Sequence, residues 1–401
     1  MDIGTISLVL LISLLVLLAI GMPLGFASGI MAVAVLMMKF GPDFLFSDFG
    51  RGPLNILFQR MYGLTTDYVI ISVPLFIFMA TLLERSGIAK DMYNSLSLWL
   101  NRTRGGIALV TSVMAVVMAA MSGIIGGEVV LLGLIALPQM LRLGYDQNLA
   151  IGTICASGSL GTMIPPSIVL IMYGLITETS IHALFQAAFV PGFLLASLYM
   201  VYIVIRTRIT PSLAPLPERG PDDMDGRTKA IYGAALIALL AGIALAGLIA
   251  RALFLDHFDR ITEDHSMVSA DFVTKAGVVL ALLAAFLLLY IRPARLAQAW
   301  HMGKGMIAPL LVVFVVLGSI YGGVTGITEA AGMGSVAVLL LIILRREFSF
   351  QLVYEALMRT FKSTGTIIWV TFGATALAGA YTIAGGPTYV ANLIIGADLP
   401  T

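Results

Sequence analysis

The chain has one cysteine and few charged residues, and each scarcity excludes a class of protein. Cys155 is the single cysteine, so an intramolecular disulfide cannot form. Charged residues make up 11% of the sequence, less than half of the roughly 25% that is usual in soluble domains. The formal net charge is +1, which gives no sign of a nucleic-acid-binding surface. The composition excludes a disulfide scaffold, a soluble enzyme and a disordered chain.

Long uncharged stretches take the place of the missing charges. Hydrophobic residues are 59% of the chain, and runs such as 6–20 and 230–250 contain no charged side chain. Their lengths are close to the ~20 residues that a helix needs to cross a bilayer. The pattern predicts an all-α polytopic membrane protein. Its apolar segments are expected near 4–20, 22–38, 68–83, 106–121, 129–141, 147–176, 185–205, 230–250, 274–291, 306–323, 328–344 and 364–383.

Lys and Arg are distributed unevenly among the loops, and membrane proteins concentrate these residues on the cytoplasmic side. The linker 207–226 holds basic residues together with four prolines and three aspartates, which indicates a solvated cytoplasmic segment. The loop 251–275 holds three basic residues against five acidic ones, which favours the opposite side. Alternation from these two loops places the N-terminus on the outer side of the membrane.

The same rule places Arg104 and Arg142 on one side of the membrane, although the segment between them is apolar. Segment 106–141 must therefore enter and leave by the same face, and its glycine-rich middle, 121–128, predicts the tip of a re-entrant helical hairpin. The following segment, 147–176, contains glycines, hydroxyl residues and a Pro-Pro pair in its middle, which predicts a broken helix. Irregular backbone at membrane depth requires a covering of protein or a water-filled cavity.

A weak internal repeat accompanies this topology. An offset of 298 residues places Ser86-Gly87 on Ala384-Gly385, and Asn94 on Asn392. By the predicted topology, the segment before Gly87 and the segment before Gly385 cross the membrane in opposite directions, as in the inverted repeats of secondary transporters. By this offset a second hairpin would begin near residue 403, so we expect the second hairpin and the second broken helix to be missing from these 401 residues. The predicted fold class is an all-α inverted-repeat membrane protein with a re-entrant hairpin and a broken helix.

Several short motifs keep one order along most of the chain. They are Gly126-Gly127-Glu128, Ala136-Leu137-Pro138-Gln139-Met140, Gly144-Tyr145-Asp146, Ala156-Ser157-Gly158-Ser159-Leu160-Gly161, Ile164-Pro165-Pro166-Ser167, Gly322-Gly323 and Gly326-Ile327-Thr328-Glu329-Ala330-Ala331. Together they resemble the large membrane (M) subunit, of the DctM type, of tripartite ATP-independent periplasmic (TRAP) transporters. Three features depart from the commoner pattern. The hairpin tip reads Ser-Gly-Ile-Ile-Gly-Gly-Glu where Ser-Gly-Ser-Ser is commoner, and the spans 230–250 and 274–291 resemble an insertion. The C-terminal family motif with its second Pro-Pro pair is missing from these 401 residues.

The resemblance implies a function and a set of partners. It implies a sodium-coupled importer of the ion-transporter superfamily that works by an elevator motion. The location would be the bacterial inner (cytoplasmic) membrane, with the N-terminus periplasmic. The implied partners are a small four-helix membrane subunit and a periplasmic substrate-binding protein. Sodium would be the coupling ion, with no other cofactor, and the solutes would be small organic acids, 2-oxo acids included.

The expected organisation follows from the topology and the resemblance. Residues 1–105 form scaffold and arm helices of the first repeat, 106–182 the transport-domain hairpin and broken helix, 183–228 a connecting span and cytoplasmic linker, 229–291 an inserted two-span hairpin, and 292–401 the scaffold and first part of an incomplete second repeat. Two amphipathic segments, 88–104 and 345–362, predict separate interfacial helices. Thr328 and Glu329 predict an N-terminal cap on a membrane helix.

The interrupted backbone is the predicted site, because unwound carbonyls and Ser or Thr hydroxyls can coordinate sodium while half-helix N-termini face anions. The predicted sodium-binding residues are Ser122, Gly123, Gly126, Ser157, Gly158, Ser159, Gly161 and Thr162. The predicted substrate-binding residues are Gly127, Glu128, Pro165, Pro166 and Ser167. Close helix packing through small residues is the alternative for the first set. For Glu128, a carboxylate at depth and thus a functional candidate, the alternative is a hydrogen bond to the tip.

Two other classes of function were compared with a transporter subunit. No His or Asp lies within the spans near Ser122 or Ser157, so we expect no intramembrane enzyme activity. The alternative function is a channel-like or non-transporting structural membrane subunit. A channel would conduct ions without a binding protein, whereas a transporter would show saturable, sodium-driven uptake.

Overall fold

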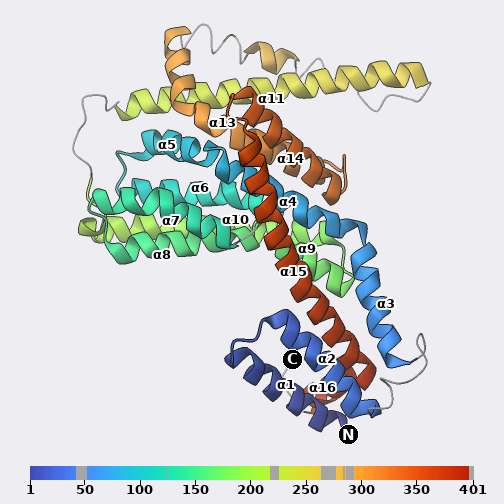
Figure 1. The fold of residues 1–401 in the computed structure, drawn as a ribbon. Helices are drawn as coiled ribbons and strands as arrows, with labels where there is room; N and C mark the ends of the chain where they lie inside the picture. The colour runs from blue at the N-terminus through green and yellow to red at the C-terminus, as the bar shows by residue number, and fades with distance from the viewer. Residues whose placement is uncertain are drawn as a thin grey trace.

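The computed structural model describes residues 1–41, 52–123, 125–216, 225–262, 277–282, 285 and 293–396 (Figure 1). Every regular element in that part of the chain is helical. The α-helices are α1 (Ile3–Ala19), α2 (Leu24–Phe40), α3 (Pro53–Thr66), α4 (Ser72–Arg85), α5 (Ile88–Leu100), α6 (Gly106–Ser122), α7 (Ile125–Arg142), α8 (Gln147–Gly158), α9 (Ile168–Thr177), α10 (Ile181–Ile209), α11 (Gly226–Thr262), α13 (Pro293–Tyr321), α14 (Ile327–Leu344), α15 (Phe350–Ala384) and α16 (Gly386–Gly396). The 3₁₀ helices are η2 (Tyr68–Ile71), η3 (Ser159–Thr162) and η4 (Pro211–Leu213).

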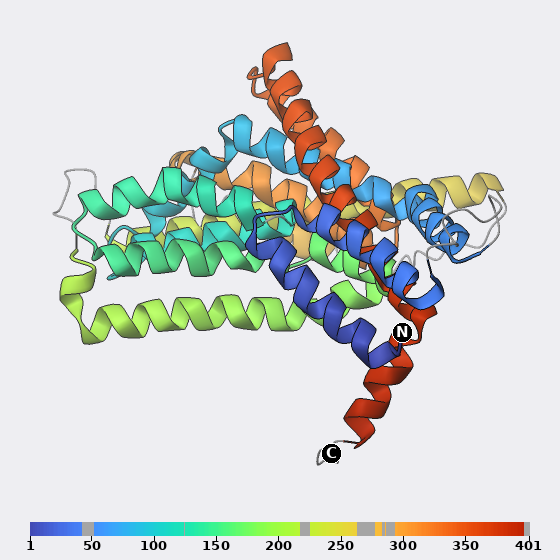
Figure 2. The same ribbon diagram turned by 60° about the horizontal axis from the view of Figure 1, so that its bottom comes forward.

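Two groups of helices are visible, and α15 runs across both (Figures 1 and 2). The larger group packs α4 to α9 with α13 and α14 around buried side chains such as Phe76, Tyr93 and Met114. The smaller group packs α1, α2 and α3 against the C-terminal part of α15, around Leu36 and Ala380. α10 lies along the outer side of the larger group, beside α6 and α8.

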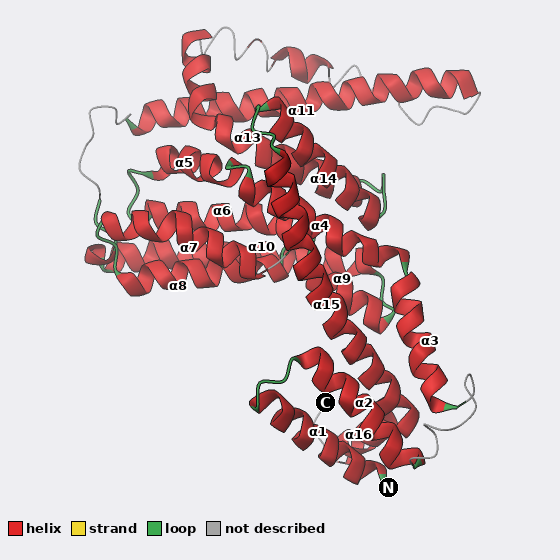
Figure 3. Cartoon of the chain, viewed as in Figure 1, coloured by secondary structure: helices red, strands yellow, loops and turns green. Residues whose placement is uncertain are grey.

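Five helices in the described residues are long and apolar enough to cross a membrane: Tyr68–Arg85, Ile181–Ile209, Ala297–Tyr321, Ile327–Leu344 and Phe350–Ala384. Figure 3 shows the helical character of the whole described chain. α10 exposes large apolar side chains along its length, Leu194, Leu198 and Ile205 among them. An exposed apolar face of this extent fits contact with lipid rather than water. The predicted all-α polytopic membrane protein is confirmed.

The prediction of two helices in 345–362 and 364–383 is wrong. One helix, α15, runs without interruption through both segments. At 35 residues it is ~52 Å long, well above the ~30 Å thickness of a hydrocarbon core. No proline lies inside it, and Gly365 at the expected boundary stays helical. Charged residues such as Arg359 and Lys362 lower the hydropathy of the first half of α15, but they do not interrupt its backbone hydrogen bonds.

The internal repeat stays a prediction, and two features of the structure agree with it. Gly87 and Gly385, related by the offset of 298 residues, both lie between two helices in the left-handed conformation, with φ of +71° and +94°. The same offset relates α4 to the second part of α15, and α2 to a segment that overlaps α14. α2 packs on α15 while α14 packs on α4, so each repeat covers a helix of the other. Figure 1 shows α15 running in roughly the opposite direction to α3.

Three further predictions have other outcomes. The predicted cap at Thr328 and Glu329 is wrong, because the cap residue of α14 is Gly326. Glu329 lies in the first turn instead and accepts a hydrogen bond from the Tyr68 hydroxyl at 3.1 Å. Helix α3 was not predicted. Much of the predicted span 274–291 and the middle of the linker 207–226 lie outside the described residues.

Candidate functional site

The predicted interruption of segment 106–141 is confirmed. α6 and α7 pack as the two arms of a hairpin. Gly123 ends α6 with φ of +61°, a left-handed conformation that glycine adopts without strain. A Cβ atom at this position would lie 2.5 Å from the carbonyl oxygen of Pro166. Glycine is therefore required twice, by the turn and by the neighbouring chain.

The helix that follows the hairpin is broken in its middle, as predicted. α8 and α9 are separated by the single turn η3 and the non-helical residues 163–167. Pro165 and Pro166 lack the N–H groups that would continue a helical ladder. The Ser167 hydroxyl donates to the carbonyl oxygen of Thr162 at 2.9 Å. The break is thus held by a hydrogen bond of its own.

The hairpin tip and the helix break lie against each other. The N–H of Ile168, the first residue of α9, donates to the carbonyl oxygen of Gly123 at 3.3 Å. The hydroxyls of Ser112 and Ser157 are 2.9 Å apart, which joins α6 to α8 within the buried interior. Two separately interrupted helices therefore form one junction, which we call the tip–break junction.

Glu128 is fully buried at the tip–break junction, in the first turn of α7. Its Oε1 accepts a hydrogen bond from the Ser122 hydroxyl. Its Oε2 has no hydrogen-bond partner among the described residues. This oxygen faces Gly161, where an added Cβ atom would lie 2.7 Å from it. Buried polar groups are normally paired, so the junction presents one carboxylate oxygen that a ligand could satisfy.

A second carboxylate reaches the hairpin tip from another helix. Glu84, near the end of α4, has its Oε1 2.6 Å from the place that a Cβ would take on Gly127. Its side chain is 11% exposed and pairs with Arg359 of α15 at 2.7 Å. Beside it, Arg85 pairs with Glu355, one turn from Arg359. Two ion pairs therefore join α4 to α15 next to the tip.

Glu84 and Arg359 were not predicted as site residues from the sequence. Each is a charged residue beside an apolar segment, and such residues are common at the ends of membrane spans. Their partnership joins positions that are distant in sequence, so no local motif records it. The one sequence feature related to this contact is the glycine at position 127, because the absence of a side chain there leaves room for the carboxylate of Glu84.

Comparison with known proteins shows the family of the chain. The family model of the tripartite ATP-independent periplasmic transporter, DctM component, matches residues 11–401. The chain belongs to this family.

Several curated relatives of this DctM-family chain are large TRAP permease proteins. The C4-dicarboxylate permease DctM of Pseudomonas aeruginosa is 30% identical over 52% of this chain and 47% of its own length. The ectoine permease TeaC of Halomonas elongata and the sialic acid permease SiaM of Vibrio cholerae are each 30% identical over 47% of this chain and 42% of their own lengths. The chain spans about half the length of the curated relatives it matches.

The structure of this DctM-family chain places the predicted sodium-binding residues on both sides of the junction. Ser122 and Gly123 end α6, and Gly126 lies in the first turn of α7. The Ser159 hydroxyl donates to the carbonyl oxygen of Ala156 at 2.7 Å, and the Thr162 hydroxyl to that of Ser159 at 2.9 Å. Because both hydroxyls act as donors there, their oxygen lone pairs stay available to a cation.

The other predicted residues line the same junction. Gly158 packs directly against Val129 of α7, with no space for a Cβ atom. The hydroxyl of Ser157 is engaged with Ser112, which is the packing role considered above. Among the predicted substrate-binding residues, Gly127 and Glu128 belong to the tip, whereas Pro165, Pro166 and Ser167 belong to the break. All thirteen predicted residues thus lie in the hairpin tip or the broken helix.

Proposed function

We propose that the chain is the membrane permease subunit of a sodium-coupled secondary importer that depends on a periplasmic binding protein. The observation that carries this proposal is the tip–break junction, where Oε2 of Glu128 lies against Gly161 without a hydrogen-bond partner among the described residues. Interrupted helices that meet inside a membrane protein form the ion and substrate sites of secondary transporters.

The chemistry of the junction suits a cation and an organic anion together. The C-terminal end of α8 presents carbonyl oxygens with partial negative charge, and the hydroxyls of Ser159 and Thr162 add neutral oxygens. The N-terminal ends of α7 and α9 have partial positive charge, which favours a carboxylate. In this proposal, sodium beside Glu128 would offset the charge of that carboxylate, so that an organic acid could bind near Ser167.

The remaining parts of the proposal rest on family membership and on the distribution of charge. They are an elevator motion, a small four-helix membrane partner, a periplasmic substrate-binding protein and a periplasmic N-terminus. The relatives are named for C4-dicarboxylate, ectoine and sialic acid. Because these solutes differ, we propose only the class of small organic acids, 2-oxo acids included.

Uptake by proteoliposomes tests the proposal. Vesicles would contain the chain with its small membrane subunit, supplied with the cognate binding protein and a labelled C4-dicarboxylate or 2-oxo acid. We expect saturable uptake that requires an inward sodium gradient. Glu128→Gln and Thr162→Ala should each raise the half-saturating sodium concentration about tenfold, since the first removes the carboxylate charge and the second removes a hydroxyl ligand. Thr177→Ala is the matched control, because the Thr177 hydroxyl bonds within α9 at 2.8 Å.

Three results would contradict the proposal. The first is unchanged sodium dependence in both junction variants, which would leave the junction with a packing role only. The second is ion current through planar bilayers without binding protein or solute, which would favour the channel-like alternative. Vesicles that retain the protein but show neither uptake nor current would favour a non-transporting structural subunit.

A further inference from the structure

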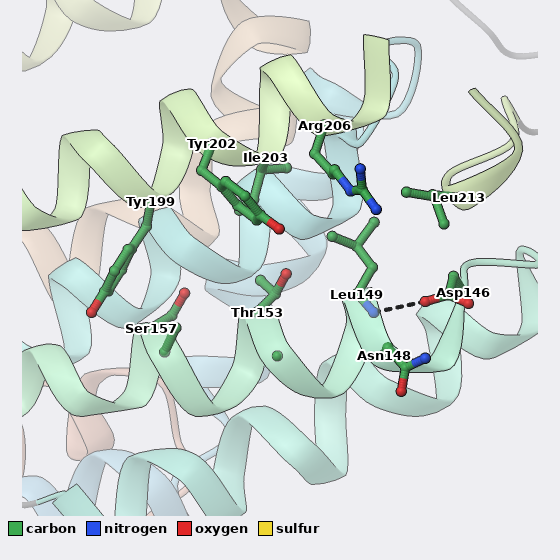
Figure 4. A pocket seen from close by; sticks show the side chains of 12 residues that line it. Asp146, Asn148, Leu149, Thr153, Ser157, Tyr199, Tyr202, Ile203, Arg206 and Leu213 are labelled. Atoms are coloured by element: carbon green, nitrogen blue, oxygen red, sulfur yellow. Dashed lines mark hydrogen bonds between the residues drawn. The ribbon is translucent and has the colours of Figure 1, made fainter. Parts of the chain in front are cut away.

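A crevice separates α8 from α10 (Figure 4), with a cavity volume of about 420 Å³. From α10, the side chains of Tyr199, Tyr202 and Arg206 point toward α8. From α8, Thr153 and Ser157 face them. The volume is in the range of small-molecule sites, ~300–1,000 Å³, and no described side chain fills it.

One end of the crevice has a cation without a partner. Arg206, in the last turn of α10, is exposed, and its guanidinium makes no ion pair or hydrogen bond within the described residues. The acidic residue nearest in the lining is Asp146, whose carboxylate caps α8 by accepting from the N–H of Leu149 at 3.0 Å. The mouth of the crevice therefore presents an exposed guanidinium that has no protein partner among the described residues.

The helix that forms one wall of the crevice, α10, has an exposed apolar face that fits contact with lipid. On the side of α10 away from the bundle, Leu198, Val201 and Ile205 are more than half exposed. The C-terminal end of α10 leads into the linker 207–226, which the distribution of Lys and Arg around it places in the cytoplasm. The cytoplasmic leaflet is the one rich in anionic lipids, and basic pockets between membrane helices on that side bind their head groups.

We propose that the crevice between α8 and α10 binds one anionic phospholipid of the cytoplasmic leaflet. The phosphate pairs with the guanidinium of Arg206, whose planar fork matches two phosphate oxygens. The hydroxyl of Tyr202, which also makes no hydrogen bond within the described residues, lies beside it to donate to the head group. An acyl chain follows the crevice past Gly152, between Ile203 and Tyr199. The crevice shares α8 and Ser157 with the tip–break junction, but its test measures bound lipid rather than uptake, so the two proposals can fail independently.

Lipid retention by the full chain tests the head-group contact. The protein would be reconstituted in vesicles of phosphatidylcholine and phosphatidylglycerol, and bound lipid would be counted by native mass spectrometry. We expect one phosphatidylglycerol on the wild type and about tenfold lower occupancy in Arg206→Gln, since a charge-assisted bond to phosphate is lost. Arg208→Gln, an exposed change two residues further along α10, should behave as the wild type.

A second pair of variants tests the acyl-chain contact. Gly152 lines the crevice and an added Cβ meets no atom within 4 Å, so Gly152→Leu introduces a larger apolar side chain at an open position of the lining. Gly133 of α7 has the same open surroundings, so Gly133→Leu is the matched control. We expect Gly152→Leu to abolish lipid retention and Gly133→Leu to preserve it.

Three results would overturn the proposal. They are wild-type retention in Arg206→Gln, equal retention of phosphatidylcholine and phosphatidylglycerol, and displacement of the lipid by inorganic phosphate at millimolar concentration. The last would assign the mouth to a free anion rather than to a lipid. Should Gly152→Leu fail to fold, which a gel-filtration profile would reveal, the comparison of Arg206→Gln with Arg208→Gln still decides.

Discussion

Replacing Gly161 by alanine is the sharpest test of the tip–break junction. The added Cβ would lie 2.7 Å from Oε2 of Glu128, 3.0 Å from its Cδ and 3.1 Å from its Oε1. The backbone of Gly161 is not left-handed, so alanine introduces no torsional strain. The whole effect must therefore arise from displacement of the buried carboxylate.

The magnitude follows from what the carboxylate loses. Overpacking a filled site costs ~1–3 kcal/mol, and loss of the hydrogen bond from Ser122 adds ~1 kcal/mol. We expect Gly161→Ala to lower the free energy of unfolding by ~2–4 kcal/mol. Gly152→Ala is the control on the preceding helix, because its Cβ meets nothing within 4 Å and alanine is favoured over glycine in helices by ~1 kcal/mol.

Thermal unfolding in detergent, followed by fluorescence, would measure these changes. We expect Gly161→Ala to lower the Tm by several degrees and Gly152→Ala to leave it equal or higher. Glu128→Ala removes the clashing group, so the double variant with Gly161→Ala should be more stable than additivity predicts. A Tm for Gly161→Ala equal to that of Gly152→Ala would refute the contact, and so would strict additivity in the double variant.

Two further predictions concern the surroundings of the junction. Gly123→Ala should lower the Tm more than Gly87→Ala. Both positions are left-handed, which costs alanine ~1–2 kcal/mol, but only Gly123 meets a neighbouring backbone oxygen; equal effects would contradict this. Glu84→Gln should destabilise by ~1–2 kcal/mol and Glu355→Gln by less than ~1 kcal/mol, because the Glu84 side chain is 11% exposed and that of Glu355 is 35% exposed. A larger effect at Glu355 in the same Tm measurement would contradict that ranking.

The breaks in the helices were predictable because their causes are local. Pro165 and Pro166 lack the N–H groups that continue a helix, and their sequence alone marks the interruption. The turn at Gly123 was predictable from topology, since the flanking basic residues required the segment to return to the same face. That the tip and the break touch follows from their closeness in sequence, since the hairpin leads directly into the broken helix.

The continuity of α15 was not predictable from hydropathy. Hydropathy reports where a helix prefers lipid or water, whereas continuity depends on backbone hydrogen bonds that Lys362 and Arg359 do not disturb. Those charges have partners far away in sequence: Arg359 pairs with Glu84, and Glu355 pairs with Arg85. A charged residue next to an apolar segment can therefore indicate an ion pair with another helix, and it need not mark the end of its own helix.

The ion pair of Glu84 with Arg359 connects the internal repeat to the proposed site. α4 contacts α15, and both of its ion pairs lie in the first part of that helix, which the offset of 298 residues relates to α3. The hairpin tip meets their contact at Gly127, where any larger side chain would collide with the carboxylate of Glu84. If the hairpin moves as proposed, the tip must leave a polar contact rather than an apolar one, and separation would re-expose the carboxylate to water. Rehydration of a charge offsets the loss of its contacts, so the tip can separate from α4 at a smaller free-energy cost than an apolar interface would impose.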